Sequence, residues 1–164
     1  MTMNDNVLRV KEFIKSRGIE VEIVTFDEST RTSELAASAI GCEVAQIAKS
    51  LMFLVDDQDP ILVIASGRNR VDTEKLAERV GNRRVKIADA KTVKRVTGFP
   101  VGGVPPIGHS HPFRTILDPA LMEFSIVYAA AGTPNAVFGI HPEELRKLTN
   151  AELVEIFRPI TDNG

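Results

Sequence analysis

The stretch that decides how this chain is organised reads Thr97-Gly98-Phe99-Pro100-Val101-Gly102-Gly103-Val104-Pro105-Pro106-Ile107-Gly108-His109. Four glycines and three prolines fall within these thirteen residues, a density that interrupts any helix or strand. Proline lacks an N–H group and fixes φ, whereas glycine reaches positive φ and lets another molecule approach the backbone. We therefore expect a loop of defined shape, in which Gly102 and Gly103 present bare N–H groups to an anionic or carbonyl oxygen.

The second informative feature is Lys49, the only formal charge between Glu43 and Asp56. The apolar run that follows predicts a buried strand over 49–55, and the segment before it predicts a short helix. An ammonium at the mouth of a buried strand must reach water, a carboxylate or a ligand. A lysine that extends to the surface would also satisfy this pattern, but the glycine-rich loop favours a ligand.

The composition is that of one globular domain over residues 1–164. Hydrophobic residues make up 43% and charged residues 26%, as in ordinary soluble proteins. The net charge of −2 argues against binding long nucleic acid by charge alone, but allows a short single-stranded end in a basic pocket. The single Cys42 excludes an internal disulfide, and no run resembles a signal peptide or approaches the ~20 residues of a membrane span. We expect a cytoplasmic protein without membrane contact.

Helical and strand patterns interleave irregularly along the chain. This order predicts an α+β fold with a mixed sheet and peripheral helices rather than a doubly wound parallel sheet. Helices are expected over 4–17, 32–40, 71–80, 90–96 and 142–157. Strands are expected over 19–26, 49–55, 61–65, 83–88, 115–117, 124–129 and 136–140.

Several common kinds of site are disfavoured. The glycine-rich stretch matches neither G-x-G-x-x-G nor G-x-x-x-x-G-K-[ST], which argues against Rossmann and P-loop nucleotide sites. His109 and His111 could face one side of an extended segment, but zinc needs at least a third ligand, for which Asp118 and His141 are candidates. We expect no metal and no cofactor, and one histidine lining a pocket. Arg68 and Arg70 follow a predicted buried strand, a position where loops often contact phosphate.

Four blocks form one pattern: Ala48-Lys49-Ser50-Leu51; Asp72-Thr73-Glu74-Lys75-Leu76; the stretch over 96–109; and Thr115-Ile116-Leu117-Asp118 followed by Tyr128-Ala129-Ala130-Ala131-Gly132-Thr133-Pro134. Together they resemble the YbaK / prolyl-tRNA synthetase-associated domain family of aminoacyl-tRNA deacylases. The resemblance spans about residues 7–148, and its most specific part is Gly-Gly-x-x-Pro-x-Gly at 102–108. It implies a mixed, largely antiparallel, barrel-like sheet surrounded by helices.

The resemblance also implies an activity, the hydrolysis of wrongly charged tRNA. Lys49 would be the main functional residue, neutralising a phosphate or polarising the ester while water or a substrate group attacks. Gly102 and Gly103 would stabilise the carbonyl oxygen. The residues implied to bind substrate are Arg68, Arg70, Gly108, His109, Asp118, Ala130, Gly132 and Thr133.

One departure from the family bears on specificity. The cysteine-specific branch carries serine in a Tyr-x-Ser-Gly-Gly stretch, where this chain has Ala130. We therefore expect a free-standing trans-editing deacylase with tRNA(Pro) as the usual substrate and without cysteinyl specificity. A synthetase insertion is disfavoured, because the chain begins and ends like a complete small protein. The expected partners are the acceptor end of charged tRNA and prolyl-tRNA synthetase. The alternative is a non-catalytic module that binds a tRNA end or nucleotide and docks on a synthetase.

Overall fold

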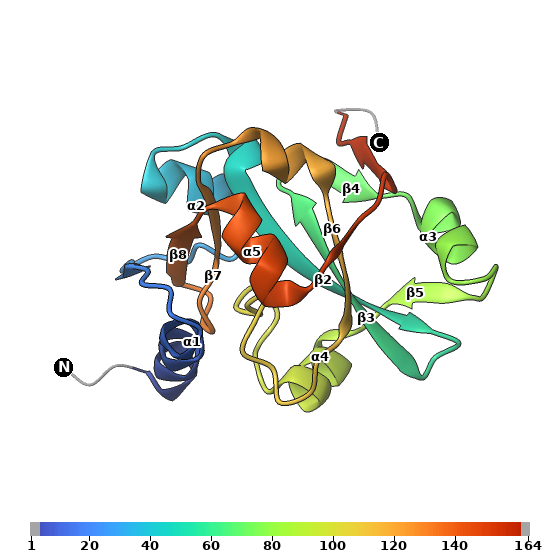
Figure 1. The fold of residues 1–164 in the computed structure, drawn as a ribbon, viewed down its shortest axis with the longest axis horizontal. Helices are drawn as coiled ribbons and strands as arrows, with labels where there is room; N and C mark the ends of the chain where they lie inside the picture. The colour runs from blue at the N-terminus through green and yellow to red at the C-terminus, as the bar shows by residue number, and fades with distance from the viewer. Residues whose placement is uncertain (1–3, 162–164) are drawn as a thin grey trace.

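The computed structural model describes residues 4–161, in which helices surround a curved central sheet (Figure 1). The helices are α1 (Asp5–Ser16), α2 (Ser33–Ile40), α3 (Thr73–Arg79), α4 (Ala90–Thr97) and α5 (Pro142–Thr149), with 3-10 turns η1 (Val44–Gln46) and η2 (Pro119–Glu123). The strands are β1 (Ile23–Thr25), β2 (Ile47–Val55), β3 (Asp59–Ser66), β4 (Asn69–Val71), β5 (Val85–Ile87), β6 (Arg114–Leu117), β7 (Val127–Ala130), β8 (Ala136–Ile140), β9 (Glu152–Leu153) and β10 (Phe157–Pro159).

The main sheet has the order β1-β8-β7-β2-β3-β6-β9, with β5 paired to β2 beside this path. Antiparallel pairs join β2 to β3 and to β5, β7 to β8, and β1 to β8. Parallel pairs join β2 to β7, β3 to β6, and β6 to β9. β4 and β10 form a separate antiparallel pair. The predicted α+β class with a mixed, largely antiparallel sheet is confirmed.

The two faces of β2 lie against different parts of the core, because successive side chains of a strand point to opposite faces. Ala48 and Met52 pack in the larger cluster, which includes Phe99 of the glycine-rich loop. Phe53 packs in a second cluster with Leu76 of α3. The central strand therefore carries side chains into both halves of the molecule.

Over residues 49–51, one edge of β2 has no neighbouring strand within the described part of the chain. Pairing with β7 stops at Ala48↔Ala129, and pairing with β5 begins only at Phe53↔Ile87. The other edge is paired continuously with β3. This opening in the sheet falls at the lysine that the sequence singles out, and it positions the candidate site.

The glycine-rich loop has the defined shape that its composition predicts. α4 ends at Gly98, which adopts φ +81°, and no strand begins before Arg114. Between these residues the loop packs inward, and Phe99, Val104 and Ile107 are buried in the core. The loop is thus packed into the core and is not a flexible linker.

Several expected boundaries are wrong. The helix expected over 142–157 ends at Thr149, because Asn150 takes a left-handed conformation (φ 51°), and β9 and β10 follow. The strand expected over 19–26 is limited to β1, and the strand expected from 124 begins at Val127 after η2. The segment expected to be helical over 71–80 begins as β4 and becomes α3 only after Asp72 caps it. The short helix expected before Lys49 is the single 3-10 turn η1.

Candidate active site

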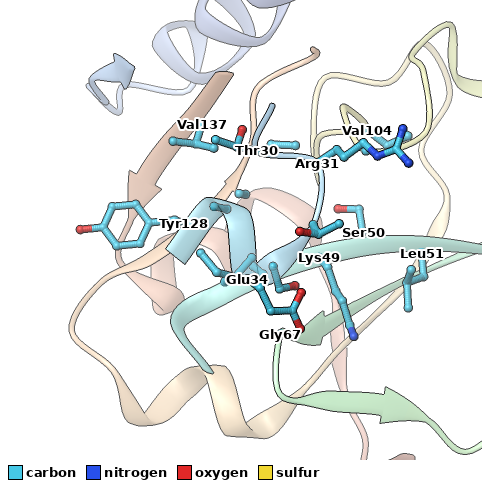
Figure 2. A pocket seen from close by; sticks show the side chains of 18 of the residues that line it. Thr30, Arg31, Glu34, Lys49, Ser50, Leu51, Gly67, Val104, Tyr128 and Val137 are labelled. Atoms are coloured by element: carbon cyan, nitrogen blue, oxygen red, sulfur yellow. The ribbon is translucent and has the colours of Figure 1, made fainter. Parts of the chain in front are cut away.

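A pocket of about 690 Å³ opens beside the unpaired edge of β2 (Figure 2). Segments that are distant in sequence form its wall: the start of α2, the first half of β2, the glycine-rich loop and β7. The lining residues are 30–34, Ala36, 47–51, Gly67, Ala90, Val101, Gly102, Val104, 128–130, Val137 and Ile160.

Lys49 lies in this wall, half-buried, where the unpaired edge of β2 begins. Burial lowers the pKa of the Lys49 ammonium, while the carboxylates of Glu34 and Asp118 act in the opposite direction. Figure 2 shows the Lys49 and Glu34 side chains extending to the same side of the pocket. Within residues 4–161 the ammonium makes no hydrogen bond and no ion pair. A partly buried cation in this state is suited to an anionic or polarised oxygen of a ligand.

Asp118 supports this wall from beneath and does not line the pocket. Its carboxylate, 1% exposed, accepts hydrogen bonds from the Ser66 N–H (3.0 Å), the Asn69 side-chain amide (2.9 Å) and the Ala120 N–H (2.9 Å). These bonds fix the turn that carries Gly67 to the pocket. The predicted substrate-binding residue Asp118 therefore lies outside the lining of the pocket, and its negative charge acts to raise the pKa of Lys49.

The two adjacent glycines of the loop have different environments. Gly102 lines the pocket at φ +87°, and a Cβ there would lie 2.6 Å from Arg31 Cβ. No acceptor for its N–H lies within the described part of the chain. The Gly103 N–H donates to the Pro100 carbonyl (2.9 Å), and a Cβ at Gly103 would lie 2.8 Å from Thr133 Cα. The expectation that both N–H groups face a ligand is thus corrected, and only Gly102 offers one.

The sequence does not predict that the residues before and within the first turn of α2 line this pocket. Thr32 caps this helix by accepting from the Leu35 N–H (3.1 Å), and residues 30–34 face the pocket. Figure 2 shows Arg31 across the pocket from Lys49. The sequence predicts a polar turn and a helix start here. No local pattern predicts that this turn lies beside β2, which follows some fifteen residues later in the chain.

On the β7 side, only Ala130 of the predicted residues lines the pocket, beside Tyr128 and Ala129. Gly132 has φ +102°, and a Cβ there would lie 2.8 Å from the Asn6 carbonyl oxygen, so this glycine lets the turn pack on α1. The Thr133 hydroxyl bonds the Asn135 side chain (2.9 Å). These two residues shape the turn between β7 and β8 and do not line the pocket.

Gly108 and His109 line a different pocket, of about 310 Å³, with Arg17, His111 and Phe113 among its walls. His109 Nε2 lies 2.8 Å from the Pro105 carbonyl oxygen, so it is the protonated nitrogen, and the buried Nδ1 has no partner among residues 4–161. Gly102 and Gly108 thus line different pockets, and the structure does not bring Gly108 and His109 together with Lys49.

Arg68 and Arg70 are exposed in the turn after β3 and in β4. The Arg68 carbonyl accepts from the Ile160 N–H (2.9 Å), and Arg70 lies opposite Arg158 in the β4–β10 pair. Because Gly67 and Ile160 line the pocket, Arg68 adjoins its rim.

Two further observations concern residues 4–161 as a whole. These residues hold no group of three or more His, Cys, Asp or Glu side chains that could bind a metal ion. None of their helices is long and apolar enough to cross a membrane.

Known proteins of similar sequence and structure indicate the family of this chain. The chain is 29% identical over 151 residues to an Enterococcus faecalis protein provisionally named Cys-tRNA(Pro)/Cys-tRNA(Cys) deacylase EbsC, covering 92% of both chains. It is 24% identical over 154 residues, again 92% of both chains, to the Escherichia coli K12 multifunctional Ser/Thr-tRNA deacylase ProXp-y.

A solved structure provisionally described as a trans-editing enzyme for prolyl-tRNA synthetase matches with a TM-score of 0.89 and 38% identity, covering 96% of this chain and 99% of that one. The family model of the aminoacyl-tRNA editing domain matches residues 27–148, which include β2, the glycine-rich loop and β7. The predicted resemblance is confirmed, and the chain belongs to the aminoacyl-tRNA editing domain family.

Proposed function

We propose that this protein is a free-standing deacylase that hydrolyses the ester bond of mischarged tRNA. The observation that carries the proposal is the Lys49 ammonium, which has no partner among residues 4–161 and lies in the wall of a pocket that Gly102 also lines. Relatives named as deacylases that match over nearly their whole length support it. Because charged tRNA is the substrate, the site of action would be the cytoplasm.

Ester hydrolysis requires of the protein mainly charged and hydrogen-bonding groups placed next to the carbonyl. Water, or a hydroxyl or thiol of the substrate, adds to the carbonyl carbon, and the carbonyl oxygen becomes negative. The bond to the ribose oxygen then breaks, and the proton that the attacking group has given up ends on that ribose oxygen. The Gly102 N–H would stabilise the oxyanion. Lys49 would polarise the same carbonyl or neutralise the neighbouring phosphate, roles that an ammonium fills as a compact point charge.

The acceptor end would enter past Arg68 and Arg70. Both are exposed, and Arg68 adjoins Gly67 of the pocket wall, so their guanidinium groups are suited to backbone phosphates. We propose tRNA(Pro) as the tRNA and prolyl-tRNA synthetase as the enzyme whose errors are removed. A second hydrolytic site is useful because a missing methylene changes binding by only ~1–3 kcal/mol, too little for accurate charging.

A panel of charged tRNAs tests this proposal directly. Purified protein is mixed with tRNA(Pro) and several other tRNAs, each charged with cognate and non-cognate amino acids, and the release of amino acid is followed. A deacylase frees a subset of non-cognate amino acids faster than the spontaneous rate and spares prolyl-tRNA(Pro). Binding to uncharged and charged tRNA ends without release of any amino acid would favour the non-catalytic module instead.

A further inference from the structure

The side chain of Ser50 is a polar group of the pocket that the proposed chemistry leaves without a role. Its Oγ is buried and has no hydrogen-bond partner among residues 4–161. Leaving a buried hydroxyl unpaired costs free energy, and natural structures rarely tolerate it without a reason. Ser50 lines the pocket, and Figure 2 shows its side chain on the opposite side of β2 from that of Lys49.

The main-chain N–H and C=O of Ser50 also face this part of the pocket, at the edge of β2 where no neighbouring strand of residues 4–161 is paired with it. The Gly67 N–H donates to the Ile47 carbonyl (2.8 Å), so Ile47 faces β3, and hydrogen-bonding groups alternate between edges along a strand. On the other edge, the Ala88 N–H donates to the Met52 carbonyl (2.9 Å). Ser50 shares the parity of Met52, so its N–H and C=O face the gap between β7 and β5.

The surroundings of Ser50 are small and apolar. Its face of β2 also carries Ala48, and Val104 and Ala129 line the pocket from the same core cluster. A serine hydroxyl both donates and accepts, and it can occupy three staggered χ1 positions, so it can turn towards a bound hydroxyl without movement of the strand. Small apolar neighbours around one hydroxyl fit a small acyl group that carries a hydrogen-bonding side chain.

We propose that Ser50 determines which acyl group is accepted: its Oγ and its open main-chain groups bind hydroxyl-bearing seryl and threonyl groups in preference to alanyl. The inference rests on the proposed deacylase function and names the substrate class of that site. Alanyl and prolyl groups have no polar side chain to satisfy the Ser50 hydroxyl. Ser50 is thus a specificity-determining residue, and Lys49 on the other face of the strand serves every substrate alike.

The test compares kcat/KM of the wild type and Ser50→Ala on one tRNA charged in turn with serine, threonine and alanine. The wild type should favour seryl over alanyl by about tenfold, the value of one hydrogen bond. In Ser50→Ala this ratio should fall to near one. Ser125→Ala is the matched control, because Ser125 is exposed and lies outside the pocket. An unchanged ratio in a folded Ser50→Ala, or a wild type that favours alanyl, would overturn the inference.

A binding measurement separates this inference from the proposed function. Adenosine carrying seryl or alanyl through a 3′-amide cannot be hydrolysed, and its affinity can be measured by calorimetry for both proteins. If the wild type binds the seryl amide more tightly than the alanyl amide, Ser50→Ala loses this preference and no ester is hydrolysed, the role of Ser50 is supported and the deacylase function is contradicted. If esters are hydrolysed but the wild type binds both amides equally, the deacylase function is supported and the role of Ser50 is contradicted. Absence of hydrolysis and of binding would contradict both. The wild-type affinities alone decide the matter if Ser50→Ala fails to fold.

Discussion

At the scale of single residues, burial acts on two bases with different consequences. It lowers the pKa of both Lys49 and His109. Lys49 faces a pocket, where a ligand anion can offset the lost hydration. His109 lies between the rings of Phe99 and Phe113, with centroids 5.7 and 5.0 Å away, and its buried Nδ1 has no acceptor within residues 4–161. The surroundings of Lys49 therefore suit the binding of an anionic ligand, whereas those of His109 favour a neutral imidazole.

His109 should therefore make stability depend on pH. Burial, partly opposed by the Pro105 carbonyl and assisted by Arg9, holds the folded pKa below its ordinary value of 6.5. The unfolded chain then binds the proton more readily, so stability is fully present above about pH 6.5 and decreases as the pH falls through that value. Denaturant unfolding at several pH values between 7.5 and 5 should show this loss in the wild type and a smaller loss in His109→Gln.

Equal pH slopes in the two proteins would contradict this role. The carboxylates whose pKa is lowered by neighbouring cations, Asp57 and Glu152, do not confuse the test. Their contribution is lost only as the pH falls below their ordinary values of 3.8 and 4.5.

At the scale of elements, Gly102 in the glycine-rich loop has both a positive φ and a close neighbour. Comparing Gly102→Ala with Gly81→Ala distinguishes the cost of backbone strain from the cost of the close contact. Gly102 and Gly81 share φ +87°, but a Cβ at Gly81 meets nothing within 4 Å, whereas one at Gly102 meets Arg31. Gly81→Ala should cost only the strain of a left-handed alanine, ~1–2 kcal/mol. Gly102→Ala should cost more, and it should also lower kcat/KM by about a hundredfold if its N–H is the oxyanion donor.

Melting temperature and turnover are measured on both variants. Gly81→Ala should keep the wild-type kcat/KM. Normal turnover per folded molecule in Gly102→Ala would reject the catalytic role and leave this glycine as a packing device. Gly103→Ala should mainly lower stability, because its N–H is already bonded within the loop.

The sequence predicts the strongly patterned elements and not the short ones. Continuous apolar runs reveal β2 and β3, and a Gly cap reveals the end of α2. β9 and β10 contain two and three residues, too few for any periodicity. They form after Asn150 ends α5, where the chain pairs with β6 and then with β4. Lys49, Gly102 and Ala130 are predicted residues that line the candidate pocket; local chemistry marks the first two, and the family resemblance marks the third. The start of α2 joins the site only through tertiary packing.

At the scale of the whole molecule, the negative net charge limits how tRNA can be held. With a net charge of −2, only local cations near the pocket should contact phosphates. About 2–4 contacts to a single-stranded end predict a slope of log affinity against log salt of about −1.5 to −3. Fluorescence anisotropy with charged-end mimics at several salt concentrations measures this slope, and the Arg68→Ala, Arg70→Ala double variant should make it shallower. A slope near −10 would contradict binding through the acceptor end.

If the Lys49 ammonium drives ester hydrolysis, the rate of single-turnover deacylation of the best substrate of the panel depends on this side chain. The comparison is between the wild type, Lys49→Ala and the control Lys75→Ala, whose side chain is exposed on α3 away from the pocket. We predict that Lys49→Ala loses about a hundredfold or more in rate, with an unchanged or higher melting temperature because a partly buried cation is removed, while Lys75→Ala keeps the wild-type rate. A folded Lys49→Ala protein that hydrolyses the substrate at the wild-type rate would show that the Lys49 ammonium does not drive the reaction.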